Sequence, residues 1–364
     1  MKVLILTREY PPHVGGGMGR AIRHIVDELH QKCGVEVTVV ANQPTLGFSM
    51  EIEDGVVVYR VPTVGSTFLT KIPSFAFFAS KLLAKLEKDY DLVYSASSPV
   101  FYKAKKPFIA HFRLTRYGLY SGGKENGKLL YAFLNKLYIP FDKLLLRRAD
   151  GVMVLSENMI EEIEAMGGTK NEIRIVPNGV DTSLFRPLRN RKFDSNEKAI
   201  LYVGRMDQGK GVDILLYAFK EVMKNTKARL MLAGDGRQKN KLLDLANSLC
   251  IPVDFLGNVP HVDLPKVYND ADLCVLPSLN EAFSLVVLEA MACGTPIIVS
   301  SACPDLGVPR FKKGDVNSLA KLLLETISSE RSLQESSENV LRISRNCDWA
   351  SVATQFCAFF EKFV

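Results

Sequence analysis

Short apolar runs alternate along the chain with segments in which apolar residues recur at helical spacing. The runs expected to form strands of a first sheet are 3–6, 36–41, 56–61, 91–94, 108–111 and 151–156. Those expected to form a second sheet are 199–204, 229–233, 252–257, 271–276 and 297–300. Helices are expected at 20–31, 77–88, 157–166, 212–224, 285–291 and 315–329. Strands that alternate with helices in this way predict an α/β protein with parallel sheets.

The segment 277–296 combines a strand end, a polar turn and a helix. Ser284 stands where a short hydroxyl competes well for the free amides of a helix start, and Gly294 and Pro296 stop the helix. Another strand follows, so the unit is a parallel crossover that leaves its turn at the carboxyl edge of the sheet. We therefore expect a ligand to bind beside this turn.

Two glutamates occupy this crossover unit: Glu281 in the turn and Glu289 inside the helix. A rise of ~1.5 Å per helical residue keeps both near one ligand-sized space. A carboxylate accepts two neighbouring hydroxyl donors, as the vicinal hydroxyls of a sugar offer. The amides of Phe283, Ser284 and Leu285 could hold an anion at the positive helix end. Alternatively, Glu289 is a surface residue and Glu281 aids helix capping.

Two glycine-containing turns are further candidates. Arg205 and Lys210 flank the turn after the strand at 199–204, where cations and helix amides converge on an anion; two solvated basic residues are the alternative. In the loop 8–19, Gly16 and Gly17 allow backbone amides to approach a phosphate or hydroxyl. That loop lacks the G-x-G-x-x-G spacing of a dinucleotide site, and a flexible loop over the sheet is the alternative.

His111 ends the strand at 108–111, at the edge where α/β sheets place functional groups. On the residues alone, it is either functional or structural.

The run NEAFSLVVLEAMACGTP at 280–296 resembles the E-x7-E segment of the retaining glycosyltransferases of family 4. The runs EYPPxxGG from Glu9 and VGRxxxxKG from Val203 are also similar to that family. The resemblance implies the GT-B fold, two Rossmann-like domains facing each other across a cleft. Residues 1–184 would be the acceptor-side domain, to which the helix at 346–364 returns, and 185–345 the nucleotide-sugar-binding domain.

The resemblance also implies roles for single residues. Arg205 and Lys210 would clamp the donor diphosphate, which Gly16 and Gly17 would touch, and His111 would lie near the donor sugar's hydroxymethyl group. We expect Glu289 to hold ribose hydroxyls and Glu281 hydroxyls of the transferred sugar. The turns expected to bracket the nucleobase contain Gly234, Gly257 and Asn258.

The expected reaction moves a sugar, with retention, from a UDP- or GDP-sugar to a hydroxyl of a glycan, lipid-linked or small-molecule acceptor. No cofactor or metal is expected, because no Asp-x-Asp pair or His/Cys ligand cluster argues for one. Ala282 replaces the family's usual Gly, and the regions 95–106 and 306–313 are shortened. These departures leave two alternatives: an inactive nucleotide-sugar-binding or regulatory protein, and a sugar-nucleotide 2-epimerase.

Composition sets the remaining expectations. A hydrophobic content of 47% and a charged content of 24% are typical of a globular protein. The seven cysteines form no C-x-x-C pair, which favours a reducing cytoplasmic location. The net charge of +6 suits phosphorylated substrates or an anionic membrane surface, but the basic residues are too dispersed to indicate nucleic acid. The oligomeric state stays open.

The segment 128–148 mixes lysines with large apolar residues and is interrupted by Pro140. Packing of its apolar face into its own domain is the favoured interpretation. Peripheral contact with an anionic membrane surface, on the cytoplasmic side, is the alternative.

Overall fold

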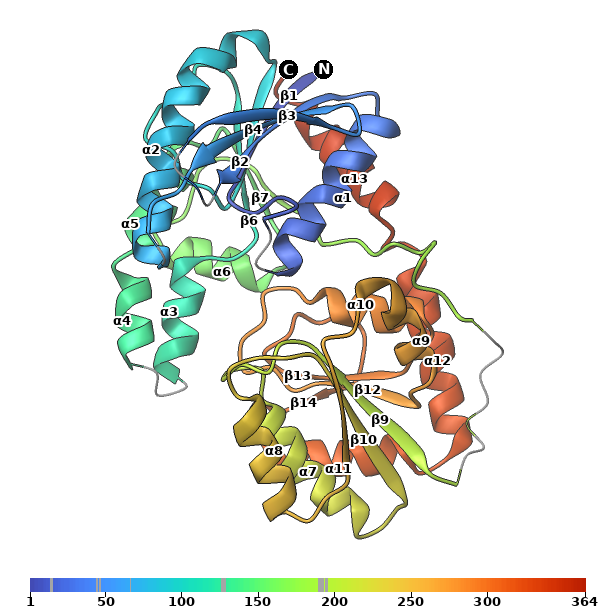
Figure 1. Ribbon diagram of the computed structural model, residues 1–364. Helices are drawn as coiled ribbons and strands as arrows, with labels where there is room; N and C mark the ends of the chain where they lie inside the picture. The colour runs from blue at the N-terminus through green and yellow to red at the C-terminus, as the bar shows by residue number, and fades with distance from the viewer. Residues whose placement is uncertain are drawn as a thin grey trace. The chain divides into compact units, whose positions relative to one another are not determined.

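The computed structural model describes residues 1–13, 16–43, 45, 47–65, 67–125, 129–188, 193 and 196–364. The chain divides into two compact units (Figure 1): unit 1 is Met1–Gly179 with Trp349–Val364, and unit 2 is Val180–Asp348. Unit 2 thus extends a few residues beyond the predicted segment 185–345 at both ends. Most of the charged segment 189–198, predicted to be a solvated loop, lies outside the described residues.

Unit 1 is built on an eight-stranded sheet in the order β3-β4-β2-β1-β5-β6-β7-β8. All neighbouring strands pair in parallel except β3 and β4, which are antiparallel. The strands are β1 (Lys2–Thr7), β2 (Glu36–Gln43), β3 (Ser49–Glu53), β4 (Val56–Pro62), β5 (Leu92–Ala96), β6 (Phe108–Phe112), β7 (Gly151–Val154) and β8 (Ile173–Ile175). β1, β5 and β6 are almost entirely buried, as their continuous apolar runs predict.

The edge strand β3 was not predicted. Its apolar side chains Met50 and Ile52 are exposed, while the carboxylates of Glu51 and Glu53 pair with Arg60 on β4. The backbone ladder with β4 and these ion pairs, rather than apolar burial, therefore hold this strand, and the hydrophobic pattern carried no signal for it.

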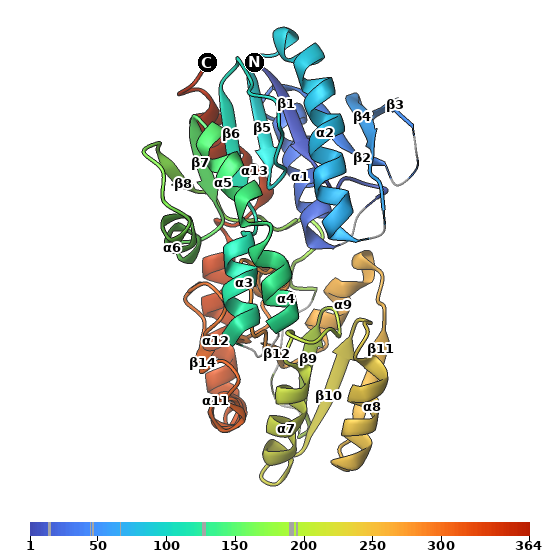
Figure 2. The ribbon, with the colours of Figure 1, turned by 90° about the vertical axis from the view of Figure 1, so that its left-hand side faces the viewer.

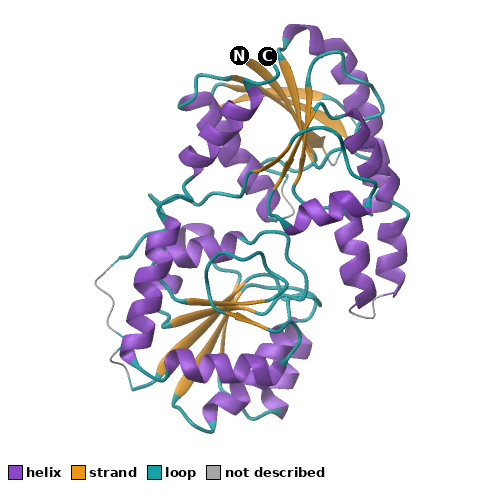
Figure 3. Cartoon of the chain, turned by 180° about the vertical axis from the view of Figure 1, so that it is seen from behind, coloured by secondary structure: helices purple, strands orange, loops and turns teal. Residues whose placement is uncertain are grey.

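The helices of unit 1 and its sheet form layers, with helices on both sides of the strands (Figure 3). The helices are α1 (Gly17–Gln31), α2 (Phe68–Leu86), the short η1 (Glu87–Asp89), α3 (Arg116–Glu125), α4 (Leu129–Lys136), α5 (Ile139–Arg148), α6 (Asn158–Ala165) and α13 (Trp349–Phe360). α2 begins nine residues earlier than predicted, although Pro73 in its second turn has no N–H to donate to the carbonyl of Leu69. The Tyr138 hydroxyl donates to that carbonyl instead. Residues 97–107 contain no helix.

The prediction for 128–148 is confirmed for α5 and wrong for α4. Leu145 and Leu146 of α5 are buried in unit 1. On α4, Leu129, Leu130 and Phe133 are exposed instead, because α4 packs on α3 through its opposite side. α3 and α4 run side by side as a helical hairpin, visible in Figures 1 and 2.

Unit 2 contains a parallel six-stranded sheet in the order β11-β10-β9-β12-β13-β14. Its strands are β9 (Lys198–Val203), β10 (Ala228–Ala233), β11 (Val253–Gly257), β12 (Leu273–Leu276), β13 (Ile297–Ser300) and β14 (Arg310–Phe311). Its helices are α7 (Val212–Met223), α8 (Lys239–Ser248), η2 (His261–Asp263), α9 (Leu264–Asn269), α10 (Leu285–Ala292), α11 (Val316–Ile327) and α12 (Glu330–Ser344). Apolar side chains of β9, β10, β12 and α7 share one core.

Candidate functional site

The turns after β9 and β12 meet at the point where the sheet of unit 2 reverses its strand order. The chain moves from β9 outward to β10 and β11, then returns to β12 on the other side of β9. Ligands of parallel α/β sheets bind at the carboxyl ends of the strands at such a switch point. Topology alone therefore brings the turn that carries Lys210 next to the turn that carries Glu281.

Backbone contacts fix these two turns against each other. The amide of Leu279 donates to the carbonyl of Gly209 over 2.8 Å. Gly211, at φ +66°, approaches the other turn so closely that a Cβ atom would lie 2.1 Å from the carbonyl oxygen of Pro277. Glycine is therefore required at 211 both by conformation and by space.

The side chains of Lys210 and Glu281 form an ion pair, with 2.7 Å between Nζ and Oε2. Both are only partly exposed, at 27% and 13% of the side chain, so solvent screens the pair less than it screens a surface pair. Ser278 Oγ lies 3.4 Å from the same Oε2. Arg205 is placed differently: its side chain is 68% exposed and pairs with Asp207 at 3.2 Å. The structure thus brings Lys210 and Glu281 together and leaves the guanidinium of Arg205 at the surface.

The glycine turns after β10 and β11 line the same carboxyl edge. The amide of Gly234 donates to the carbonyl of Gly257 over 2.7 Å. Gly234, at φ +139°, lies against the turn after β9, where a Cβ would come within 1.9 Å of the Gly204 oxygen. Asn258 is exposed beside them. The predicted base-bracketing turns are therefore neighbours of the turn that carries Arg205 and Lys210.

The amino end of α10 opens on this edge. Ser284 is the N-cap residue, and its hydroxyl makes no capping bond, contrary to the expected competition for the first amides. Phe283 and Ser284 are buried, and Leu285 is the first helical residue. The first amides of a helix have no intrahelical acceptor, so this end can receive an anion or a hydroxyl oxygen.

Glu289 lies in the second turn of α10 and is buried, with 5% of its surface exposed. Its Oε2 accepts a hydrogen bond from the Tyr268 hydroxyl at 2.8 Å, and its Oε1 lies 3.2 Å from Nε2 of His261. The interpretation of Glu289 as a surface glutamate is therefore wrong. Phe185 packs edge-on against both His261 and Tyr268, with ring centroids 5.1 and 6.0 Å apart.

His261 and Tyr268 were missed at the sequence level. The signal that could have found them is the cost of a glutamate within an otherwise apolar helix, which demands partners from a neighbouring element. Burial, and next the charge of Glu289, raise the pKa of Tyr268, so its hydroxyl stays protonated and donates to the carboxylate.

In unit 1, His111 is completely buried at the end of β6. The Tyr94 hydroxyl lies 2.7 Å from its Nδ1, and the ring of Phe356 on α13 packs 5.6 Å away. Burial, and next the charge of Arg113, hold the pKa of His111 well below its usual range, so the ring is neutral. Nε2 has no partner among the described residues. In the tautomer in which the Tyr94 phenol donates to Nδ1, the proton sits on Nε2.

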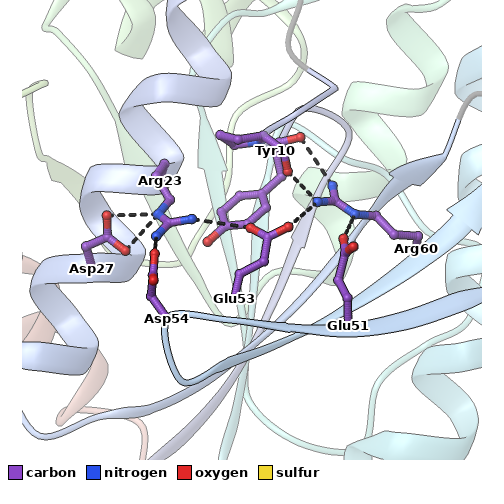
Figure 4. Close-up of polar contacts among 8 residues, drawn as sticks. Tyr10, Arg23, Asp27, Glu51, Glu53, Asp54 and Arg60 are labelled. Atoms are coloured by element: carbon purple, nitrogen blue, oxygen red, sulfur yellow. Dashed lines mark hydrogen bonds and ion pairs between the residues drawn. The ribbon is translucent and has the colours of Figure 1, made fainter.

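The first glycine loop is anchored by a buried arginine of β4 (Figure 4). Arg60 donates from Nη1 to the carbonyl of Tyr10, at 3.2 Å, and from Nη2 to both the carbonyl of Pro11 and Glu53, while Glu51 accepts from Nε. Val14 and Gly15 lie outside the described residues. Gly16 has an extended backbone, at φ 172°, and precedes Gly17, where α1 begins. The loop therefore reaches the helix start from a fixed base.

No group of three or more His, Cys, Asp or Glu side chains that could hold a metal ion occurs within the part of the chain that the structure describes.

Two α/β units, each built on a mainly parallel sheet, are the architecture of the GT-B class of glycosyltransferases. Two family models match: "Glycosyltransferase Family 4" over residues 15–184 and "Glycosyl transferases group 1" over residues 188–339. An uncharacterized glycosyltransferase of Methanocaldococcus jannaschii is 30% identical over 88% of this chain and 84% of its own length. The chain belongs to glycosyltransferase family 4 and is a glycosyltransferase.

Solved structures agree with this fold. Sucrose-phosphate synthase from Thermosynechococcus elongatus superimposes with a TM-score of 0.82, at 20% identity over 99% of this chain and 98% of that one. Anabaena HepE, in complex with UDP and glucose, superimposes with a TM-score of 0.74, at 18% identity over the full length of both chains. The fold is GT-B, as predicted: two α/β domains with parallel sheets.

Proposed function

We propose that this glycosyltransferase moves a sugar from a nucleoside diphosphate-sugar, with UDP or GDP as the leaving group, to a hydroxyl of a glycan, lipid-linked or small-molecule acceptor. The observation that carries the proposal is the Lys210–Glu281 pair beside the amino end of α10. It puts a cation, a carboxylate and helix amides within one turn region, which matches a diphosphate joined to a sugar. The UDP complex of HepE supports the donor class.

In this proposal Lys210 and Arg205 neutralise the charge that develops on the departing diphosphate. Lys210, which Glu281 already holds in place, would stabilise that charge without reorganising, whereas Arg205 would have to turn from Asp207 to join it. An ammonium group has three donors, so Lys210 can retain Glu281 as a partner while it binds a phosphate oxygen. In this proposal the protein's own cations neutralise the diphosphate, and no metal is obligatory. Activity that persists in the presence of a chelator would support this point.

The carboxylates bind hydroxyl groups. Glu281 would accept from hydroxyls of the transferred sugar. Glu289 would accept from the ribose, which requires its His261 contact at 3.2 Å to give way while Tyr268 continues to hold Oε2. His111 would donate from Nε2 to the transferred sugar. We propose that the anomeric configuration is retained and that the departing phosphate takes the acceptor's proton.

The test has two stages. First, the thermal unfolding of the full chain is followed with UDP, GDP and ADP and with their sugars, and one base is expected to raise the melting temperature. Second, the selected donor is incubated with acceptor panels, and NMR coupling constants give the anomeric configuration of the product. A stabilising nucleotide with no transfer to any acceptor would favour a binding or regulatory protein; a sugar epimerised at carbon 2 would favour an epimerase.

We also infer that the protein works in the reducing cytoplasm, because all seven of its cysteines are free thiols. None of the helices among the described residues has both the length and the apolar character that crossing a bilayer requires. Contact with a membrane would therefore be peripheral in this proposal, and the α3–α4 hairpin is the surface that suits it.

A further inference from the structure

The apolar side of α4 faces outward. Leu129, Leu130, Phe133 and Leu137 are 70%, 73%, 57% and 53% exposed, and Tyr131 is exposed beside them. Sixteen large hydrophobic side chains are exposed among the described residues, and these five are among them. All five fall within nine consecutive positions. A cluster of this density on a folded surface indicates an interaction site.

The inner side of α4 is small and polar, which is why the large residues face out. Ala132 and Asn135 are buried against α3. Asn135 Oδ1 accepts from Nη1 of Arg116 at 3.2 Å, and a Cβ on Gly123 would lie 3.2 Å from that of Ala132. At 3.6 residues per turn, Leu129, Leu130, Phe133 and Leu137 form one continuous stripe opposite this contact, while the ring of Tyr131 lies beside Gly123 of α3. The geometry of the hairpin, visible in Figure 2, therefore displays the stripe rather than burying it.

The segment that contains the stripe is basic in sequence. Residues 116–148 contain seven of the chain's 46 Lys and Arg residues but only two of its 40 Asp and Glu residues, so they carry five of the six net positive charges. One of the two acidic residues, Asp142, is buried and bound to the amide of Arg116. Lys124 on α3 and Lys136 on α4 are exposed. Lys136 Nζ also lies 5.8 Å from the ring centre of Tyr120 on α3.

We propose that the α3–α4 hairpin docks onto an anionic lipid bilayer, with Leu129, Leu130, Phe133 and Leu137 entering the boundary between headgroups and acyl chains. Lys124 and Lys136 then contact anionic headgroups, and the Tyr131 ring lies at the interface, where aromatic side chains with a polar tip are favoured. A second copy of this chain is a poorer occupant, since two surfaces of equal positive charge repel each other.

Docking onto a bilayer would bring the proposed transferase to a lipid-linked acceptor. This role of the docking rests on the proposed function. Vesicle binding is measured without sugar transfer, so either claim can fail while the other stands.

The test uses the full chain and vesicles of phosphatidylcholine, with or without phosphatidylglycerol, separated by flotation. Binding to the anionic vesicles is expected, with little binding to phosphatidylcholine alone. The double variant Leu130→Asp/Phe133→Asp should lower the partition coefficient by about tenfold or more, because two large apolar side chains no longer leave water. The control Tyr217→Asp changes an exposed aromatic residue of α7 in unit 2 and should bind like wild type.

Insertion has its own optical readout. The chain has one tryptophan, Trp349, which is buried. In Phe133→Trp, a blue shift of the new emission on adding anionic vesicles would show that position 133 enters the bilayer. Lys136→Glu should weaken binding to anionic vesicles.

Three results would each overturn the proposal. They are an absence of wild-type binding to anionic vesicles, binding that survives Leu130→Asp/Phe133→Asp, and a dimer in ultracentrifugation that this double variant dissociates while vesicle binding is absent.

Discussion

Lys210 and Glu281, 71 positions apart in the sequence, join the turns after β9 and β12 through an ion pair of 2.7 Å. The pair holds the ammonium group of Lys210 at the carboxyl edge of the sheet. In the proposed function, Glu281 would offer oxygens to sugar hydroxyls and orient this ammonium group toward the diphosphate.

Replacing Lys210 with Ala should lower kcat roughly a hundredfold or more, because it removes a preorganised positive charge from the leaving diphosphate. Steady-state kinetics with the preferred donor measures the effect. Lys224→Ala is the matched control: Lys224 forms an equally short pair with Glu221, at 2.7 Å, on the exposed end of α7. Turnover of Lys210→Ala equal to that of the control would remove Lys210 from the mechanism.

Substituting Glu289 with Gln should weaken donor binding by about 1–3 kcal/mol, through the loss of a charge-assisted hydrogen bond to the ribose. Calorimetry with the selected nucleoside diphosphate gives the value. Tyr268→Phe provides a comparison, since it keeps the carboxylate but removes its 2.8 Å hydrogen bond. If only Tyr268→Phe weakened binding, Glu289 would be a structural acceptor rather than a ligand of the ribose.

His111→Ala should lower kcat/KM while Tyr94→Phe, which removes the partner of Nδ1, lowers it less. The reason is that Nε2, not Nδ1, is the donor available to a sugar. Thermal unfolding of both variants distinguishes a role of His111 in binding the sugar from a role in the stability of unit 1. A lowered melting temperature with full activity in His111→Ala would show that the histidine only fills the space between Tyr94 and Phe356.

Asp142 predicts a specific pH dependence of stability. Burial, the largest cause, raises the pKa of its carboxyl to about 6, although the amide and charge of Arg116 favour ionisation. The folded chain therefore binds this proton more tightly than the unfolded chain, and the carboxyl's contribution to the free energy of unfolding falls as pH rises from about 4 to about 6.

In Asp142→Asn this dependence should vanish, since an amide oxygen can still accept from Arg116. From about pH 4 to about pH 6, the free energy of unfolding of the variant should then rise by about 3 kcal/mol relative to that of wild type, because wild type loses the stabilisation that the raised pKa of Asp142 provides. Urea unfolding at several pH values measures it. Parallel pH profiles of the two proteins would contradict the assignment.

Arg60→Met should lower the free energy of unfolding by about 3 kcal/mol, because the carbonyls of Tyr10 and Pro11 and the partly exposed carboxylates of Glu51 and Glu53 lose their buried donor. Arg229→Met is a control on another strand, since Arg229 is exposed and only 3.9 Å from Asp254. Equal effects of the two substitutions would show that Arg60 does not anchor the loop after β1.

The sequence predicted the strands that are buried on both faces and therefore consist of continuous apolar residues. β1, β6 and β12 are continuous apolar runs, and the E-x7-E spacing placed Glu281 before α10 and Glu289 within it. It could not predict β3, whose pairing depends on carboxylates meeting Arg60 from β4, or the outward direction of α4. Apolar spacing shows that a helix has an apolar side but not which side its neighbour covers.

The same limit applies to the candidate site. The sequence predicted that Lys210 binds a phosphate and that Glu281 binds sugar hydroxyls. It did not predict that the two side chains pair, because this contact follows from the order of β9 and β12 in the sheet. The burial of His111 against Phe356 depends on α13, which joins unit 1 from the far end of the chain. Contacts of such sequence separation leave no local pattern.

The most direct test is a crystal structure of the full chain with the nucleoside diphosphate-sugar that stabilises it best. The account predicts the diphosphate within hydrogen-bonding distance of Lys210 Nζ and the first amides of α10, with the ribose hydroxyls on Glu289. A sugar nucleotide bound away from the carboxyl edge of the six-stranded sheet would contradict it.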